Sequence, residues 1–527
     1  MGDNNNDSNN PLPPVDDWRA RRAATLDESR SVAAQKRHAR GFRTARENLE
    51  DLCDPDTFIE YGQLAVAAQR SRKTEEELRS NTAADGILTG TATINADIFG
   101  TGATQSAVII NDYSVLAGTQ GHFHHKKLDR ILEVARENQL PVVMYTEGGG
   151  GRPGDVDVTT VSSGLTAPSF ASWAALSGVV PRIAVNNGYC FAGNAALFGS
   201  ADITIATETS WIGMAGPAMI EGGGLGQFAP TDIGPAEAQS QNGVVDVVVA
   251  DEAAATTMAK KLLGFFQGKT AEFECPDQKP LATSLPENRR MSYKIREIIS
   301  VLADTDSTIE LRPKCGSGII TAFMRLDGRP VGLLANDCRV LAGAINAAAA
   351  EKAARFMQLC DAFDIPLLSL CDTPGFMVGP DSEREAAVRR MSRMFVVGAS
   401  VRVPWVAVFL RKGYGLGAMA MTGGSLARPS LTAAWPQGEF GPMGLEGAVN
   451  LGFRAELEAE TDGAARQRLF DSLVEQMYEK GKAVEAESYV ELDAVIDPVD
   501  TRAVIIRALD AARNSKRKRR PRFVDVW

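Results

Sequence analysis

The segment Asn111-Asp112-Tyr113-Ser114-Val115-Leu116-Ala117-Gly118 occurs a second time, as Asn336-Asp337-Cys338-Arg339-Val340-Leu341-Ala342-Gly343. The shift is 225 residues, and it holds without a gap for about forty positions. A further match follows after a deletion of two residues, with positions 192–194 against 415–417. A period this long far exceeds the repeat unit of a solenoid. The sequence therefore predicts two copies of one domain.

The length of the chain agrees with a duplication. A chain of 527 residues is too long for a single core and fits two domains of roughly 200 to 250 residues plus an extension. The composition, 44% hydrophobic and 7% aromatic, is that of a globular protein. We expect a disordered tail over residues 1–18, a first domain over 19–285 and a second over 286–527, joined by the proline-containing segment 269–290.

Charge and targeting signals limit the partners and the compartment. The net charge of −10 argues against a nucleic-acid-binding protein. The basic run at 516–520 is either a solvated tail or a contact with a phosphate or an acidic partner. No apolar run reaches transmembrane length, and residues 1–14 resemble neither a signal nor a transit peptide. The seven cysteines show no CxxC pairing, which favours buried free thiols in a reducing compartment. We expect a cytoplasmic protein without membrane contact.

Alternating patterns predict an α/β fold. Strands are expected at 91–94, 107–110, 141–145, 182–186 and 202–206, with an amphipathic helix over 126–138. The second copy repeats this order, with strands at 330–336 and 366–371 around a helix over 347–363. Such an alternation is typical of right-handed βαβ crossovers. Residues 17–52 are predicted to be helical, and so is the charged segment from 449 to 488, before a small α/β piece at 494–511.

Three glycine-rich loops follow predicted buried strands, at 147–154, 187–195 and 411–419. Each opens a predicted helix, where free main-chain N–H groups favour an anion or a developing oxyanion. A phosphate cradle is the alternative, although no loop matches GxxxxGK[ST] or GxGxxG. A third interpretation is close packing of helix on strand through glycine. The presence of two such loops at equivalent positions of a repeat favours function.

Few side chains offer catalysis of their own. His122, His124 and His125 are three of only four histidines, and they predict either a polar loop or a wall of a substrate pocket more readily than a metal site. No Ser/His/Asp or Cys/His set can be nominated. Glu147 and Asp372 occupy equivalent positions and form either a functional carboxylate pair or, more simply, acceptors that organise their loops.

Together these stretches resemble the carboxyltransferase (β) subunits of the biotin-dependent acyl-CoA carboxylases, the propionyl-, methylcrotonyl- and acetyl-CoA group. The resemblance runs from about residue 37 to the end. Positions 44–47 are similar to the TARE helix of the family, 341–356 to its LAG and EKAARF segment, and 372–376 to its D-x-PGF turn. Positions 411–415 resemble RKxYGG, and 434–449 resemble AWP and MGxxGAV at the family's spacing.

The resemblance implies two tandem crotonase-like (ClpP/crotonase) domains related by internal duplication. It implies an N-domain that binds the acyl-CoA, a C-domain that binds carboxybiotin, and a site completed between subunits, in a core expected to be a hexamer. Carboxybiotin would release CO2, and the thioester enolate of the substrate would attack it. Both enolates need oxyanion holes of main-chain donors, so neither metal nor side-chain nucleophile is required.

The same resemblance nominates the site residues. The expected catalytic backbone positions are Ala192, Gly193, Leu416 and Gly417. The expected substrate-binding positions are Gly149, Gly150, Gly151, Arg152, Phe191, Asn194 and Met419. The expected biotin-side positions are Gly375, Phe376, Tyr414 and Gly415. The chain departs from the family's pattern at Gly148, where a serine is usual, and at Asn194, where a second glycine is usual.

Cofactor and partners follow from what the chain lacks. It has neither a Met-Lys-Met biotinylation site nor an ATP-binding loop, so biotin and the ATP-dependent step are expected from a partner biotin carboxylase and carboxyl carrier subunit. One alternative is the carboxyltransferase subunit of an acyl-CoA decarboxylase or of a transcarboxylase. Another is a non-catalytic scaffold with the same fold, which the presence of both glycine-rich loops disfavours.

Overall fold

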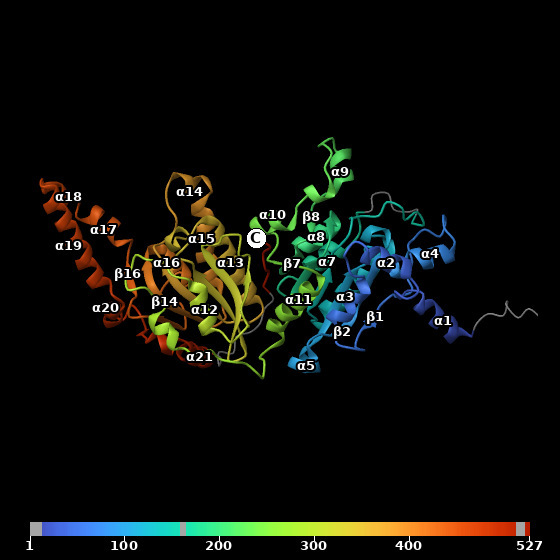
Figure 1. Ribbon diagram of the computed structural model, residues 1–527, viewed down its shortest axis with the longest axis horizontal. Coiled ribbons are helices and arrows are strands. Elements are labelled where there is room, and N and C mark those ends of the chain that lie inside the picture. Colours follow the sequence, from blue (N-terminus) through green and yellow to red (C-terminus); the bar gives the residue numbers. More distant parts are fainter. Residues whose placement is uncertain (1–12, 159–164, 513–521) are drawn as a thin grey trace, which may run out of the picture. The chain divides into compact units, whose positions relative to one another are not determined.

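The computed structural model describes residues 13–158, 165–512 and 522–527 (Figure 1). The basic run at 516–520 lies outside the described residues, and so does most of the predicted tail. The chain divides into two compact units, the first comprising residues 1–239 and 248–263 and the second 240–247 and 264–527. Each unit is built on one mixed sheet with flanking helices. The α/β fold predicted from the sequence is confirmed.

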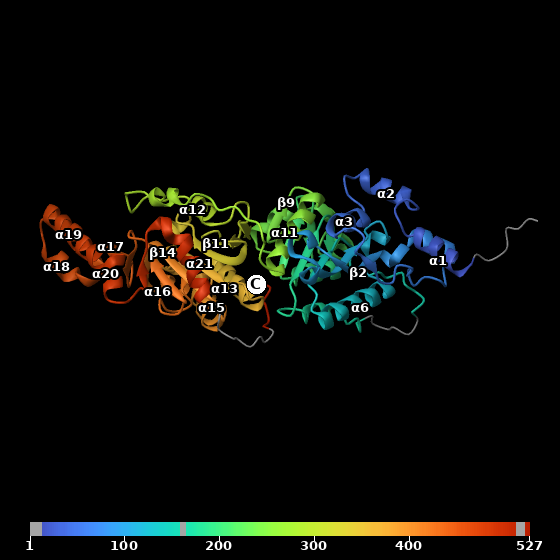
Figure 2. The same cartoon turned by 90° about the horizontal axis from the view of Figure 1, so that it is seen from below.

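The first unit contains a seven-stranded sheet with the order β1-β2-β3-β4-β5-β7-β9. The β1–β2 and β2–β3 pairs are antiparallel, whereas β3, β4, β5 and β7 run parallel. The bounds of these strands are β1 Ile59–Glu60, β2 Ile87–Thr93, β3 Gln105–Asn111, β4 Val142–Tyr145, β5 Arg182–Asn186, β7 Ile203–Thr207 and β9 Val247–Val249. Helix α6 (His122–Asn138) crosses from β3 to β4 and packs along β2 and β3 (Figure 2).

The second unit repeats this topology, with the order β10-β11-β12-β13-β14-β15-β17 and β16 paired to β14. Again the first two pairs are antiparallel and the others parallel. The bounds are β10 Ile309–Leu311, β11 Ile319–Leu326, β12 Arg329–Asn336, β13 Leu367–Thr373, β14 Trp405–Tyr414, β15 Leu431–Ala434, β16 Glu439–Gly441 and β17 Ala494–Val495. Helix α13 (Ala347–Ala362) provides the crossover that α6 provides in the first unit.

The repeat begins earlier than the sequence comparison indicated. Helix α3 (Ala45–Leu52) and helix α12 (Ile295–Leu302) each precede the first strand of their sheet. Arg46 of α3 pairs with Glu60 at 3.1 Å, and Arg296, next to α12's first residue, pairs with Glu310 at 2.8 Å. The shift here is 250 rather than 225 residues, because the first unit has a longer connection after β1. That change of shift hid this part of the repeat.

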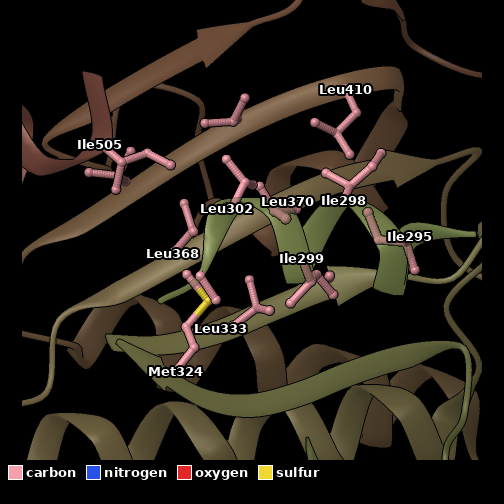
Figure 3. Close-up of a cluster of buried hydrophobic side chains, with 14 of the residues drawn as sticks. Ile295, Ile298, Ile299, Leu302, Met324, Leu333, Leu368, Leu370, Leu410 and Ile505 are labelled. Atoms are coloured by element: carbon pink, nitrogen blue, oxygen red, sulfur yellow. The ribbon is translucent and has the colours of Figure 1, made fainter. Parts of the chain in front are cut away.

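The core of the second unit explains why α12 belongs to it. The apolar residues of α12 recur at three- and four-residue spacing and lie on one face of the helix. Figure 3 shows this face against leucines of β12, β13 and β14. The side chains of α12 in this cluster are Ile295, Ile298, Ile299 and Leu302, all at most 3% exposed.

Two boundaries differ from the sequence predictions. Residues 264–285, predicted for the first domain, pack with the second unit: the Phe265 ring stacks on Phe323 at 5.2 Å, and Leu281 is buried with α12. At the N-terminus, α1 begins at Pro14, so residues 14–18 are helical. The helix predicted over 17–52 is three helices, α1 (Pro14–Ala23), α2 (Ser31–His38) and α3, because Thr44 caps α3 in a capping box and starts it anew.

Two buried lysines mark the repeat inside the core. The Nζ of Lys127 donates to the carbonyl oxygens of Ala84, at 2.9 Å, and Ile87. Its counterpart Lys352 donates to the carbonyl oxygen of Arg312, at 3.1 Å. Both side chains are at least nine-tenths buried, and burial lowers the pKa of each ammonium from 10.5 to about 8.

These pKa values predict a pH-dependent stability. Unfolded lysine keeps its proton up to about pH 10.4, whereas each folded lysine releases it near pH 8, so the free energy of unfolding should rise as the pH increases from 8 to 10. Chemical denaturation should show this rise in the wild type, by up to about 3 kcal/mol per lysine. The rise should shrink in Lys127→Met and in Lys352→Met, but persist in Lys126→Met, which changes an exposed neighbour. Equal pH dependence in all four proteins would contradict the assignment.

The described residues contain no helix that is both long and apolar enough to cross a membrane. All seven cysteines are free thiols, and five of them are buried.

Candidate active site

The segment that defines the repeat forms an unusual turn in both units. Leu116, Ala117 and Gly118 have consecutive φ values of 49°, 55° and 61°. The equivalent residues 341–343 have φ values of 49°, 54° and 91°. Leucine and alanine rarely adopt this left-handed conformation. Both turns lie against the loop after the next strand, since a Cβ on Gly118 would come within 2.6 Å of the Glu147 carbonyl oxygen.

The loop after that strand is held by one short parallel bridge in each unit. The N–H of Gln120 donates to the Gly150 carbonyl at 2.7 Å, and the N–H of Arg152 donates to the Gln120 carbonyl at 2.9 Å. In a parallel bridge the residue between these two bonds directs its own N–H to the opposite side. The amide of Gly151 therefore faces away from Gln120.

The second unit has the same bridge. The N–H of Ile345 donates to the Gly375 carbonyl at 3.0 Å, and the N–H of Met377 donates to the Ile345 carbonyl at 2.8 Å. The amide of Phe376 therefore faces away from Ile345, as the Gly151 amide faces away from Gln120. Gly151 and Phe376 thus hold equivalent positions, each with a main-chain donor directed away from its bridge.

The helix that follows starts in the same way in both units. Ala192 precedes α8 (Gly193–Gly199) with a φ of 51°, and Gly415, the first residue of α16 (Gly415–Met421), has a φ of 56°. The pairing of Phe191 with Gly213 and of Tyr414 with Gly441 matches these starts in space. Ala192 therefore corresponds to Gly415, and the predicted deletion of two residues is confirmed.

This register pairs Gly193 with Leu416 and Asn194 with Gly417. The first amides of a helix have no acceptor within it. These amides lie beside the loop: a Cβ on Gly150 would be 2.7 Å from the Cβ of Ala192 and 3.6 Å from the Gly193 nitrogen. A Cβ on Gly417 would be 2.6 Å from the Cα of Gly375. In each unit the glycine-rich loop and the helix start are in direct backbone contact, which leaves main-chain N–H groups as the functional groups at that place.

The two equivalent carboxylates are buried, and each has an arginine partner. Glu147 is 3% exposed and accepts from both terminal nitrogens of Arg37, at 3.0 and 2.8 Å. Burial raises the pKa of Glu147 to about 7, against the attraction of Arg37. Asp372 accepts from Arg411 at 2.9 Å and from the Lys412 N–H at 3.1 Å. Both organise their surroundings as expected, but Glu147 does so through a guanidinium, and only Asp372 accepts a main-chain bond.

The structure corrects the predicted role of Arg152. Its guanidinium is 4% exposed and pairs with Asp85, lies 3.5 Å from Asp155, and donates to the Thr119 carbonyl at 2.8 Å. A buried charge needs such partners, and these use the groups that a substrate would bind. Arg152 therefore holds the loop rather than contacting the acyl-CoA through its side chain.

Three more side chains predicted to line the site are in the protein interior. Asn194 is fully buried and accepts from the Gly150 N–H at 3.0 Å, so its side chain does not line a pocket. Phe191 is 6% exposed, and Tyr414 is 2% exposed within an apolar cluster around α17 (Leu445–Gly452). By contrast, the side chains of Leu416 and Met419 are exposed, at 60% and 36%.

The histidine cluster divides between the core and a polar chain. His124 is fully buried, and burial holds its pKa well below the usual value. His125 is half-buried, and its Nδ1 lies 2.8 Å from the hydroxyl of Ser169, which donates to Asp129 at 2.5 Å. The chain reaches the site only through a neighbour, because the His125 ring lies 6.1 Å from that of Phe170 and a Cβ on Gly193 would meet Phe170.

A cationic cavity beside the first turn was not foreseen. It has a volume of about 430 Å³ and lies between α2 and the turn that contains Ala117. Arg30 and Arg37 already pair with carboxylates, whereas Lys36 and Arg40 are exposed at its edge. Its lining also includes the hydroxyl-bearing residues Ser29, Ser31, Ser80, Tyr113 and Ser114. A search for glycine-rich loops could not find it, since its groups come from four separate segments.

Comparison with known proteins gives the class of this chain. Residues 36–526 match the carboxyl transferase domain family. The chain belongs to this family and is therefore an enzyme, a carboxyltransferase. The resemblance inferred from the sequence motifs is confirmed.

Particular relatives narrow the comparison. The 12S subunit of methylmalonyl-CoA carboxyltransferase from Propionibacterium freudenreichii subsp. shermanii is 33% identical over 92% of this chain and 91% of its own. The propionyl-CoA carboxylase β chain of Roseobacter denitrificans is 30% identical over 93% and 96%. A solved structure of a single-chain, multi-domain long-chain acyl-CoA carboxylase matches 95% of this chain with a TM-score of 0.90 and 52% identity. The present chain spans about half of that protein, 49% of its length.

Proposed function

We propose that this carboxyltransferase moves CO2 from carboxybiotin, carried on a partner chain, to the α-carbon of an acyl-CoA. The observation that carries the proposal is the repeated contact of a glycine-rich loop with a helix start, once in each unit. A reaction with two enolate-like oxygens needs two sets of donors, and main-chain amides are suited to that role because they are fixed before the charge develops.

The first unit would serve the thioester. We assign the amides of Gly151 and Gly193 to the thioester oxygen, where each donor typically contributes about 3 kcal/mol to the transition state. No side chain with a suitable pKa is needed there. Gly149 and Gly150 would allow close approach of the substrate to the main chain, as glycines permit.

The second unit would serve biotin. The residues present fit this group, because Gly375 and Gly417 bring two main-chain segments into contact without intervening side chains, and Leu416 is exposed beside them. The amides of Phe376 and Gly417 would hold the ureido oxygen. When bound, carboxybiotin supplies the CO2. Gly415 permits the turn, and Tyr414 anchors it in the core.

Fold and assembly are proposed from the same family. We infer that each unit is a crotonase-like domain and that the two arose by duplication, which agrees with the repeated strand order. A hexameric core in the cytoplasm, with biotin on a partner biotin carboxylase and carrier subunit, is the expected assembly. A transcarboxylase or decarboxylase complex is the alternative, since one relative is a methylmalonyl-CoA carboxyltransferase subunit.

The test is a carboxylation assay with bicarbonate, ATP and the cognate biotin-carrying subunit. Acyl-CoAs from acetyl- and propionyl-CoA to long-chain thioesters should be compared, because the 52% identical relative is a long-chain acyl-CoA carboxylase. ATP-dependent carboxylation of at least one of them is expected. Decarboxylation of a dicarboxylic thioester without ATP, and no ATP-dependent carboxylation, would favour the alternative.

We further propose that the cationic cavity at α2 holds phosphates of coenzyme A. Replacing both Lys36 and Arg40 by methionine should raise the KM for the acyl-CoA about tenfold or more, the equivalent of about 1.4 kcal/mol in binding, with little change in kcat. The KM for the corresponding acyl-pantetheine, which lacks the nucleotide phosphates, should not change. Lys261→Met, which removes an exposed charge on α11 (Glu252–Gln267), is the matched control. An equal effect on both substrates would contradict the phosphate assignment.

A further inference from the structure

The two units satisfy the same loop amide in different ways. In the second unit the N–H of Gly375 donates to the hydroxyl of Thr373, at 3.1 Å, and Thr373 is fully buried. The equivalent position in the first unit is Gly148, which has no hydroxyl to offer. There the N–H of Gly150 donates to Oδ1 of Asn194 instead, at 3.0 Å. The acceptor has moved from the loop itself to the first turn of the helix.

The space around the loop shows that the two solutions exclude each other. A Cβ on Gly148 would lie 2.3 Å from Nδ2 of Asn194 and equally close to the Gly118 carbonyl oxygen. In the second unit the position of Asn194 is Gly417, where a Cβ would lie 2.6 Å from the Cα of Gly375. Each unit therefore has room for one acceptor side chain and needs glycine at the other position.

Asn194 also joins more elements than the threonine does. Its Nδ2 lies 3.5 Å from the Gly118 carbonyl oxygen, at the end of the left-handed turn. Its Oδ1 accepts from the loop, and its backbone belongs to α8. A fully buried carboxamide is costly without such partners, so these contacts fix where the side chain lies.

We propose that Asn194 is a positioning residue of the thioester-side amides, and that Gly148 and Asn194 together replace the Thr373–Gly417 pair of the second unit. By holding the Gly150 amide, Asn194 sets the direction of the next amide, that of Gly151. The role in turnover rests on the proposed function. The ordering of the loop does not rest on it, because it follows from the contacts alone.

Hydrogen–deuterium exchange of the loop, measured together with steady-state kinetics of the assembled enzyme, tests this role. In Asn194→Leu, amides of residues 148–152 should exchange about tenfold faster, as expected for the loss of one ordering hydrogen bond. The kcat should fall between about tenfold and a hundredfold, with the KM for the carboxylated carrier within about twofold of the wild type. Asn194→Asp keeps an acceptor at a helix start, where negative charge is favourable, and should stay within about threefold in both measurements.

Two further variants use the second unit as a reference. Thr373→Val removes the hydroxyl at nearly constant volume and should accelerate exchange in residues 373–377 while leaving 148–152 unchanged. Gly148→Thr should lower kcat strongly by displacing Asn194, and adding Asn194→Gly should recover at least about tenfold. This recovery would distinguish a coupled exchange from two independent defects.

Each outcome bears on a separate part of the proposal. Unchanged exchange at 148–152 in Asn194→Leu would overturn the ordering role, whatever the activity. Faster exchange with unchanged kcat on an active enzyme would overturn the role in turnover. A double variant no better than Gly148→Thr would overturn the coupling. If the wild type carboxylates no acyl-CoA, the proposed function fails, but the exchange measurements still decide the ordering role. Should Asn194→Leu not fold by circular dichroism, Asn194→Ala takes its place.

Discussion

Replacing Gly417 with alanine is expected to reduce kcat for carboxylation by about a hundredfold or more. The new Cβ would lie 2.6 Å from the Cα of Gly375 and 2.7 Å from its carbonyl carbon, both main-chain atoms. The loop cannot retreat without losing the bond from Gly375 to Thr373 and the bridge to Ile345. Removing one oxyanion donor costs about 10² to 10³ in turnover, and displacing the loop would misplace both proposed donors.

The control for this variant is Gly447→Ala in α17, where a Cβ would meet no atom within 4 Å. It should behave as the wild type. Replacing His122 and His125 together by glutamine should also leave kcat within about threefold, because neither imidazole is assigned a proton transfer. Circular dichroism should confirm folding of all three. A dead histidine variant beside an active Gly417→Ala would refute the proposed mechanism and require a histidine-based one.

Replacing Arg152 with methionine is expected to destabilise the protein by about 3 to 5 kcal/mol, the usual consequence of breaking a buried ion pair from one side. Asp85 is fully buried, and its charge would lose the guanidinium that compensates it. Chemical denaturation of the variant should show this loss, and adding Asp85→Asn should restore part of it. Folded enzyme should retain nearly the wild-type KM for acyl-CoA, because Arg152 does not present its side chain to the substrate.

Arg130→Met is the matched control for the loss of Arg152. Arg130 pairs with Glu133, but the two side chains are 58% and 55% exposed. An exposed pair contributes only between about 0 and 1 kcal/mol, so this variant should be nearly neutral. A large rise in KM for Arg152→Met without a loss of stability would instead restore the substrate-binding role predicted from the sequence.

The main architecture could be predicted from the sequence because the two copies reinforce each other. The shift of 225 residues, the buried strands and the loops at 147–154 and 411–419 were all visible, and the family motifs identified the class of enzyme. The earlier start of the repeat was hidden by an insertion after β1. The predicted boundary near residue 285 was too late because proline-rich composition does not reveal that Leu281 packs in the second core.

The candidate site was predictable only for its backbone. Glycine at 150, 375 and 417 signals close approach, and the structure shows that approach. The orientation of side chains was not predictable, because sequence does not say which atoms a long side chain will meet. Arg152 and Asn194 were expected to face substrate, yet both are used inside the protein. The cationic cavity was missed because its residues are far apart in the chain.

The use of main-chain amides has a consequence for inhibition. A reagent that labels a nucleophilic side chain finds no target among the proposed donors, since an amide N–H carries no reactive electron pair. Compounds that present a stable anionic oxygen to both the loop and the helix start would bind instead through shape and charge. Resistance to such compounds could not arise by exchanging a donor side chain. It would require a change in the path of the backbone, which the left-handed turns at 116–118 and 341–343 strongly constrain.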